Sequence, residues 1–242
     1  MKVYTCFLIG FAFLNAQIAS LQKNAPISVL SSIKTVDIEH RNEIATFDPR
    51  WVDSLSLSLP CYGIPVPKRT MRLPNAPRNY RNGTHRGLDF FANWGTPVRS
   101  VADGIVVRSD IHYEEVPADF RENLLKATTK VGHTPSDIFN SVLLGKSVFL
   151  DHGFDLIPGF RTISIYAHLS HIEKEIIPGA VVKKGELLGK SGNTGMREST
   201  IGSKAGSHLH WEMILQKGEQ EIYLGKGMSN PELYDILVRI FN

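Results

Sequence analysis

A strictly alternating segment near the C-terminus, residues 206–213, constrains the fold of this 242-residue chain most strongly; it reads Gly-Ser-His-Leu-His-Trp-Glu-Met. In a β-strand, whose side chains alternate between two faces, His208, His210 and Glu212 lie on one face. The side chains that alternate with them from Leu209 onward are apolar. Such a strand packs on a core along one side and lines a cleft along the other. Two histidines on the cleft side can bind one metal ion or one substrate.

The composition is that of an ordinary globular protein, with 42% hydrophobic and 21% charged residues. Disordered and fibrous classes are therefore excluded. The formal net charge is only +3, and the basic residues are scattered along the chain. Because nucleic-acid binding needs a concentrated basic surface, we expect no nucleic-acid partner.

The N-terminus has the order of features of a secretory signal. Lys2 is followed by an apolar run over residues 3–14 and by the small residues Ala19 and Ser20, and the run is short for a membrane-spanning helix. We predict that residues 1–20 are a signal peptide and that the chain is exported to the periplasm or the extracellular side of the cell envelope. No membrane contact is then expected after cleavage. The alternative is an uncleaved membrane anchor.

Residues 21–59 are mixed in polarity and are expected to form an N-terminal arm or pro-segment. Within this arm, residues 55–59 alternate like a single strand. Residues 60–77 contain five prolines, which predict a loop over the surface and a domain boundary. Residues 60–242 are therefore expected to form the main domain.

From Gly95 onward, short runs rich in β-branched residues alternate with glycine turns. Residues 95–107 read as strand, Asp-Gly turn and strand. Further strands are expected at residues 147–150, 162–166 and 181–188. Short strands with frequent turns predict a mainly β fold, an antiparallel sheet or sandwich.

Helical signals interrupt this pattern between residues 110 and 145. The apolar set Phe120, Leu124 and Leu125 predicts one helix, and Gly132 predicts its end. We expect an inserted helical hairpin.

The second helix of the insert is expected to begin at a cap formed by residues 134–137, Thr-Pro-Ser-Asp. A C-terminal helix is expected to begin at residues 230–232, Asn-Pro-Glu. Its apolar stripe should pack on the sheet. The stripe consists of Leu233, Ile236, Leu237, Ile240 and Phe241.

A second polar cluster lies near His85. In an extended chain, His85, Gly87 and Asp89 share a face. Taken alone, a surface ion pair is the simpler interpretation, and a strand histidine such as His208 is more often solvated than metal-bound. A third cluster ends an apolar strand at His168, which would face the same cleft. Because a catalytic zinc ion needs three His, Asp or Glu ligands and one open position, the clusters together can supply a zinc site.

The order of these clusters resembles the lysostaphin-type, or LytM-like, zinc metallopeptidases, endopeptidases that cut the peptides of peptidoglycan. The resemblance rests on His85-x-x-x-Asp89, then Tyr166-Ala167-His168-Leu169, then His208-Leu209-His210, and it extends over residues 60–233. Further phrases that look like the family's lie at residues 95–98, 102–106, 151–153, 182–186 and 189–195. The resemblance implies a mostly antiparallel β domain with a groove over its main sheet.

Position by position, the resemblance implies that His85, Asp89 and His210 bind one Zn²⁺ per chain and that His168 and His208 are catalytic. Zinc lowers the pKa of water that it binds from about 16 toward about 7, and it can polarise the scissile carbonyl. A base must take the proton of the attacking water and a donor must stabilise the oxyanion. The sequence does not decide which of the two histidines does which. The expected function is that of an exported zinc endopeptidase that hydrolyses peptidoglycan cross-links or stem peptides in cell-wall remodelling or lysis.

The main alternative is a non-catalytic relative of the same fold that binds the cell wall or activates an amidase. Such relatives have usually lost zinc ligands, whereas this chain keeps all three. Residues 179–189 are also similar to the hairpins of lipoyl- and biotin-carrying domains, but Lys190 lacks the setting of a modified lysine.

Several features are left without a defined task. The insert at residues 110–145 and the arm at residues 21–59 are extra to the compact family pattern; each can act as a lid or inhibitory segment, or bind a regulatory protein. Tyr80 and Arg86 flank the first ligand pair, where they either contact substrate or are solvated loop residues. Glu212 has no assigned function.

Overall fold

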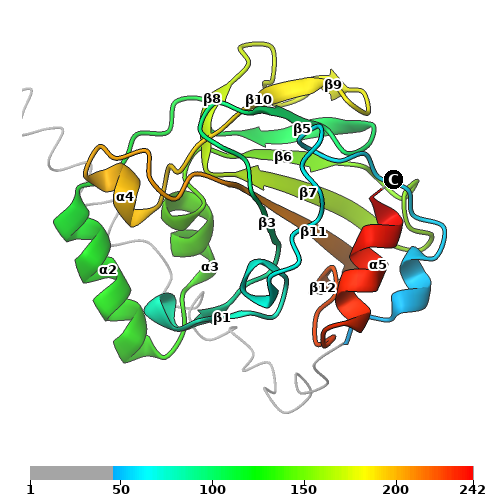
Figure 1. Cartoon of the computed structure of the whole chain (residues 1–242), viewed down its shortest axis with the longest axis horizontal. Coiled ribbons are helices and arrows are strands. Elements are labelled where there is room, and N and C mark those ends of the chain that lie inside the picture. The colour runs from blue at the N-terminus through cyan, green and yellow to red at the C-terminus, as the bar shows by residue number, and fades with distance from the viewer. Residues whose placement is uncertain (1–45, 242) are drawn as a thin grey trace, which may run out of the picture. The chain divides into compact units, whose positions relative to one another are not determined.

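A seven-stranded antiparallel sheet forms the centre of the protein in this computed structural model, which describes residues 46–241. The expected signal peptide and residues 21–45 of the expected arm lie outside the described residues. The strand order is β12 (Gln220–Tyr223), β11 (Leu209–Lys217), β7 (Arg161–Ala167), β6 (Val148–Asp151), β5 (Gly104–Ser109) and β9 (Val181–Val182), and β3 (Leu88–Phe90) also pairs with β11. Figure 1 shows β11 and β7 side by side in the middle of the sheet.

A smaller antiparallel sheet has the order β4 (Pro97–Arg99), β10 (Leu187–Ser191) and β8 (Leu169–Ile172). A third pair joins β1 (Pro77–Arg78) to β2 (Gly83–Thr84). The predicted mainly β, antiparallel fold is therefore confirmed. Two helical turns, η4 (Thr70–Arg72) and η5 (Asn79–Arg81), interrupt the proline-rich loop and the short pair.

The predicted hairpin at residues 95–107 is wrong in its pairing. Both strands form, but β4 pairs with β10 and β5 pairs with β6 and β9, so the two strands belong to different sheets. The segment between them is already bonded elsewhere: the Ser100 N–H donates to the Glu186 carbonyl and its carbonyl accepts from the Gly185 N–H. Residues 183–186, which include these two partners, form a turn that divides the single strand expected at residues 181–188 into β9 and β10.

The core lies beneath the apolar face of β11. Leu209, Trp211 and Met213 are fully buried there, as their alternation predicts. Helix α5 (Glu232–Ile240) packs on this face, and the Phe241 ring that follows it lies 5.1 Å from the Trp211 ring, centroid to centroid. The predicted C-terminal helix is thus confirmed, and its buried residues are Leu233, Ile236, Leu237 and Ile240. Its start lacks the expected side-chain cap, because the Asn230 amide donates to the Thr70 hydroxyl instead.

The described part of the expected arm belongs to the same core. After the short helical turn η3 (Pro49–Val52), Leu55 and Leu57 are buried while Ser56 between them is exposed. The alternation is therefore real, but it produces a single bridge between Leu57 and Phe241 rather than a strand. The packed unit accordingly begins before Pro60.

The insert forms the predicted helical hairpin, with α2 (Ala118–Val131), α3 (Ser136–Ile138) and a π-helical turn, η6 (Phe139–Leu143). Gly132 ends α2 with a φ of 86°, a conformation that glycine adopts without strain. The predicted cap of the second helix is wrong, because the Thr134 hydroxyl bonds the Arg81 carbonyl instead. In Figure 1, α2 and the short helix α4 (Arg197–Thr200) lie at the opposite end of the domain from α5.

The helix predicted from Phe120, Leu124 and Leu125 is confirmed as α2, but these apolar residues do not form its buried face. The residues that α2 buries are Arg121 and Thr128, whereas Phe120 is 52% exposed. Leu124 and Leu125, which lie between the two buried positions, are only half-buried. Among residues 46–241, no helix is long and apolar enough to span a membrane.

Candidate metal centre

Strand pairing brings the expected ligands together. β3 pairs with β11 so that Asp89 stands directly opposite His210. Side chains at opposite positions of an antiparallel pair share a face and lie within contact distance. His85 precedes β3 by three residues, at the end of the short β1–β2 pair, and its side chain turns to the same face.

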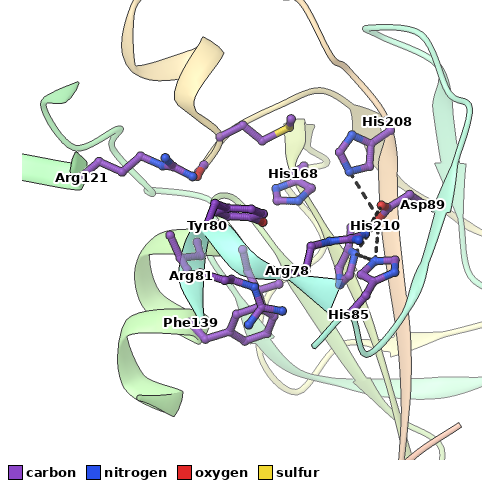
Figure 2. A pocket seen from close by; sticks show the side chains of 14 residues that line it. Arg78, Tyr80, Arg81, His85, Asp89, Arg121, Phe139, His168, His208 and His210 are labelled. Carbon is purple, nitrogen blue, oxygen red and sulfur yellow. Dashed lines mark hydrogen bonds and ion pairs between the residues drawn. The ribbon is translucent and has the colours of Figure 1, made fainter. Parts of the chain in front are cut away.

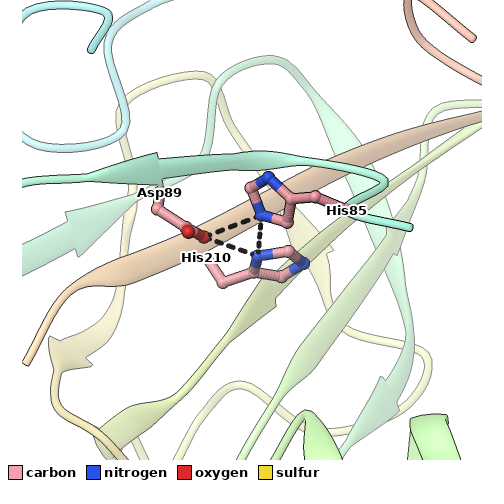
Figure 3. A group of neighbouring side chains, drawn as sticks. All are labelled: His85, Asp89 and His210. Atoms are coloured by element: carbon pink, nitrogen blue, oxygen red, sulfur yellow. Dashed lines mark hydrogen bonds and ion pairs between the residues drawn. The ribbon is translucent and has the colours of Figure 1, made fainter. Parts of the chain in front are cut away.

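The ligand atoms of these three residues converge on one point (Figure 3). Asp89 Oδ1 lies 2.9 Å from His85 Nε2 and 2.8 Å from His210 Nδ1, and the two nitrogens are 3.1 Å apart. All three side chains are buried. Among the described residues, these three side chains form a group whose ligand atoms lie close enough together, within 4.8 Å, to hold one metal ion.

The far side of each imidazole fixes where its proton lies. His85 Nδ1 lies 2.8 Å from the Leu73 carbonyl, which can only accept, so Nδ1 donates and Nε2 keeps a lone pair. His210 Nε2 donates to Glu212 Oε1 at 2.8 Å, which makes Nδ1 the nitrogen that would bind a cation. Three potential ligand atoms thus face one another within about 3 Å, an arrangement that suits a divalent cation. The residues present therefore fit a metal ion.

Glu212, which sequence reasoning left without a task, is fully buried and orients His210. Its second oxygen is 3.0 Å from the Arg86 guanidinium. Arg86 is thus neither a substrate contact nor a solvated loop residue, as the sequence suggested, but the ion-pair partner of Glu212. The sequence signal that could have revealed this contact is the position of Glu212 two residues after His210, on the same strand face.

The electrostatics of the centre depend on these acid–base pairs. Burial acts to lower the pKa of His210, but hydrogen bonds to Asp89 and Glu212 outweigh it and raise that pKa to about 9, so a metal ion binding at Nδ1 must displace a proton that Nδ1 otherwise donates to Asp89. Burial acts to raise the pKa of Asp89, yet the charge and hydrogen bonds of the surrounding histidines hold it well below its usual range. Arg78 adds an ion pair at 3.0 Å to the other oxygen of Asp89. The carboxylate is therefore ionised and ready to bind a cation.

The two further histidines flank the ligand group (Figure 2). His168 lies between β7 and β8, and its Nδ1 donates to the Thr194 carbonyl at 2.8 Å. His208 Nδ1 donates to the Gly206 carbonyl at 2.8 Å, and its Nε2 lies 3.5 Å from Asp89 Oδ1. The two rings are 4.9 Å apart between centroids. The structure thus places all five expected site residues together, while their separate roles stay predictions.

His168 occupies an uncommon backbone conformation, with a φ of 60°. Side chains other than glycine rarely adopt it, and where they do, it often marks a functional site. The backbone N–H of His168 donates to the Leu144 carbonyl, which helps hold this conformation. Burial in the pocket, with further contributions from His208 and His210, lowers the pKa of His168 well below its usual value. His168 is therefore a neutral imidazole at neutral pH, with its Nε2 lone pair available.

A pocket of about 220 Å³ opens over the centre. Its floor is formed by the ligands and by His168 and His208. Tyr80 also lines the pocket, and its side chain is largely exposed, so its contact with substrate stays a prediction. The insert supplies one wall through Arg121 and Phe139.

The remaining described histidines lie outside this pocket. His152 is buried and structural, because its Nδ1 donates to the Asp103 carbonyl at 2.6 Å and its Nε2 accepts from the Ser164 hydroxyl at 2.7 Å. His171 is exposed and lies 3.7 Å from the Glu173 carboxylate.

Residues 127–222 match the model of peptidase family M23. The chain is 29% identical over 162 residues, 64% of this chain and 25% of the relative, to an "uncharacterized metalloprotease" of Haemophilus influenzae. It spans about a quarter of the length of the curated relatives it matches. Two similar solved structures are the catalytic domain of lysostaphin from Staphylococcus simulans and a zinc-containing peptidase from Vibrio cholerae.

The lysostaphin domain is 20% identical, with 77% of this chain and 98% of that chain covered and a TM-score of 0.38. The Vibrio cholerae peptidase is 20% identical, with 71% of this chain and 37% of that chain covered and a TM-score of 0.34.

Proposed function

This chain carries a domain of peptidase family M23, a family of metallopeptidases, and from that premise we propose that it is an exported, zinc-dependent endopeptidase that hydrolyses peptide bonds of peptidoglycan. The observation that carries the proposal is the convergence of His85, Asp89 and His210 beside two further histidines in one pocket. Each of the three ligands is buried and fixed from behind by a second contact, as metal ligands usually are.

Zinc is the metal proposed for the centre. Two imidazoles and one carboxylate leave a fourth position open, which is typical of catalytic rather than structural zinc sites. When bound, zinc polarises a carbonyl and increases the acidity of water at the site. The protein itself fixes the ligand orientation through Leu73, Arg78 and Glu212.

His168 is the proposed proton acceptor. Its imidazole is neutral, its Nδ1 is held by the Thr194 carbonyl, and its Nε2 is free to take a proton from the attacking water. His208 is the proposed donor, because its Nδ1 is held by the Gly206 carbonyl and its Nε2 lies 3.5 Å from Asp89 Oδ1, beside the ligand group. A protonated His208 can stabilise the oxyanion and then protonate the leaving amine.

Export, the cell-envelope location and the peptidoglycan substrate are parts of the same proposal. They rest on the signal-like N-terminus and on the resemblance of the site motifs, and the proposal includes no membrane contact after signal cleavage. A regulatory protein is proposed to dock on the exposed face of the insert, residues 110–145, because α2 turns Phe120 outward.

The proposal is tested by digesting purified sacculi with the zinc-loaded protein and identifying the released peptides by mass spectrometry. Release of new amino termini by the native chain, and its loss in His168→Ala with zinc content unchanged, is the expected result. His171→Ala is the matched control, because His171 is exposed and outside the pocket. A zinc-loaded native chain that binds sacculi but releases nothing would instead support the non-catalytic, wall-binding function.

A further inference from the structure

The insert helix α2 buries an arginine where an apolar residue is expected. A surface helix normally packs through an apolar stripe, but the buried residues of α2 are Arg121 and Thr128. Arg121 is only 8% exposed. Because removing a guanidinium from water is costly unless its charge and N–H groups are satisfied, this placement calls for a specific partner.

The protein satisfies Arg121 only in part. Its Nε donates to the Gly195 carbonyl at 3.1 Å, which uses one of the five guanidinium N–H groups. The Glu115 carboxylate accepts from the N–H of the same glycine, Gly195. No carboxylate among residues 46–241, however, lies within 4.0 Å of the Arg121 guanidinium. Arg121 lines the pocket, and Figure 2 shows its side chain reaching toward it from α2.

Arg81 is a second buried arginine that lines the pocket. It is 7% exposed, lines the pocket and stacks on the Phe139 ring, 4.6 Å from the ring centroid. One terminal nitrogen donates to the Thr84 carbonyl at 2.6 Å, and Arg81 has no carboxylate partner within the described part of the chain.

The other two arginines at the centre behave differently. Arg78 pairs with Asp89 and Arg86 pairs with Glu212, so both are neutralised by the carboxylates of the metal centre. Among the described residues, neither Arg81 nor Arg121 has a carboxylate within 4.0 Å, so two largely buried guanidinium groups without an ion pair line a pocket whose floor carries the proposed catalytic groups.

We propose that Arg121 and Arg81 form a carboxylate-binding subsite, which makes the pocket selective for peptides that carry a free carboxylate beside the scissile bond. This inference rests on the proposed endopeptidase function and names its substrate class. The planar guanidinium fork matches a carboxylate through paired, charge-assisted hydrogen bonds. The carboxylate is either the C-terminal group of the peptide or a side-chain group, and the shared chemistry is what the subsite reads.

The subsite has a direct link to catalysis. Gly195, whose carbonyl accepts from Arg121, follows Thr194, whose carbonyl orients His168. A carboxylate held by Arg121 therefore lies next to the loop that positions the proposed base. Binding of the carboxylate therefore positions the substrate relative to the proposed base, His168.

The test compares soluble peptidoglycan peptides with free carboxyls and the same peptides amidated with carbodiimide and ammonia. The native, zinc-loaded chain is expected to cleave the free acid with a kcat/KM about 10- to 100-fold higher than the amide, the range expected for charged hydrogen bonds. Arg121→Gln and Arg81→Gln are each expected to bring the acid-to-amide ratio close to one. Synthetic peptides amidated only at the C-terminus or only at the side chain then identify which carboxylate is bound.

Arg197→Gln is the matched control, because Arg197 is an exposed arginine on neighbouring α4 and does not line the pocket. It should leave the ratio unchanged. Zinc content and thermal melting show whether the Arg121 and Arg81 variants fold. A native chain that cleaves acid and amide equally would overturn the subsite, and so would an Arg121→Gln variant that slows both peptides by the same factor.

Binding separates failure of the subsite from failure of the proposed function. If the native chain cleaves neither peptide, the endopeptidase function is overturned, and the affinities of the His168→Ala variant for acid and amide still decide the subsite. Tighter binding of the acid, lost with Arg121→Gln, supports it; equal affinities refute it.

Discussion

Replacing Glu212 by Gln isolates the contribution of the buried carboxylate behind His210. The Gln side chain has the same shape, and its oxygen can still accept from His210 Nε2, now 2.8 Å from Glu212 Oε1. What disappears is the charge that makes His210 a stronger ligand. Partners of this kind change metal affinity by about 10- to 100-fold. At about 1.4 kcal/mol per factor of ten, the loss should be about 1.4 to 2.8 kcal/mol of zinc-binding free energy.

The assay is a zinc titration against a chelator of known affinity, with both proteins at one pH. Glu221→Gln is the matched control, because Glu221 is exposed on β12, away from the metal centre, and its carboxylate accepts from the Gln216 amide at 3.2 Å. Arg86 loses its ion pair in Glu212→Gln, although its side chain is 26% exposed. The free energy of unfolding must therefore also be measured, and it should fall by about 1 to 3 kcal/mol relative to the native chain. Zinc affinity within twofold of the native value in a folded Glu212→Gln protein would refute the orienting role.

Three further predictions concern other parts of the fold. His168→Gly should be more stable than His168→Ala by about 1 kcal/mol in urea unfolding, because glycine tolerates the φ of 60°; equal stabilities would contradict strain at this position. Burial raises the pKa of Cys61 to about 12 from 9.0, so the unfolded chain loses the thiol proton first as the pH rises. Between pH 9 and 10 the native protein should lose about 1 kcal/mol more stability than Cys61→Ala, and parallel pH profiles would contradict this. Phe139→Ala should cost about 3 to 5 kcal/mol and expose the insert to proteolysis, because the ring is buried between Arg81 and Arg86; a loss below 1 kcal/mol would show that the insert docks by other contacts.

The sequence predicted the parts of the structure that local periodicity controls. The period of two on β11 separated Trp211 from His210, and the period of a helix identified the buried face of α5. These predictions succeed because neighbouring residues on one element decide them. The grouping of His85 and Asp89 with His210 needed the resemblance to a family, because spacing alone allowed a surface ion pair.

Long-range partners could not be predicted in the same way. The Asp103-Gly104 turn signal predicted a hairpin, but the choice of partner strand depends on segments more than 40 residues away, such as β6 and β10. The apolar residues of α2 predicted a helix, but they did not predict that Arg121 is the residue this helix buries at the pocket. Nothing in the local pattern distinguishes a buried arginine from a solvated one. The carbonyl that Arg121 contacts belongs to Gly195, in a loop far away in the sequence.

The most direct test of the central claim is an anomalous-scattering map of the zinc-loaded protein, recorded on both sides of the zinc absorption edge. We expect one peak per chain within about 2.0 to 2.2 Å of His85 Nε2, Asp89 Oδ1 and His210 Nδ1, with no peak bonded to His168 or His208. Two results would contradict the ligand set on which the proposed function rests. One is the absence of a peak beside His85, Asp89 and His210 in protein that retains zinc, and the other is a zinc ion bound by His168 or His208.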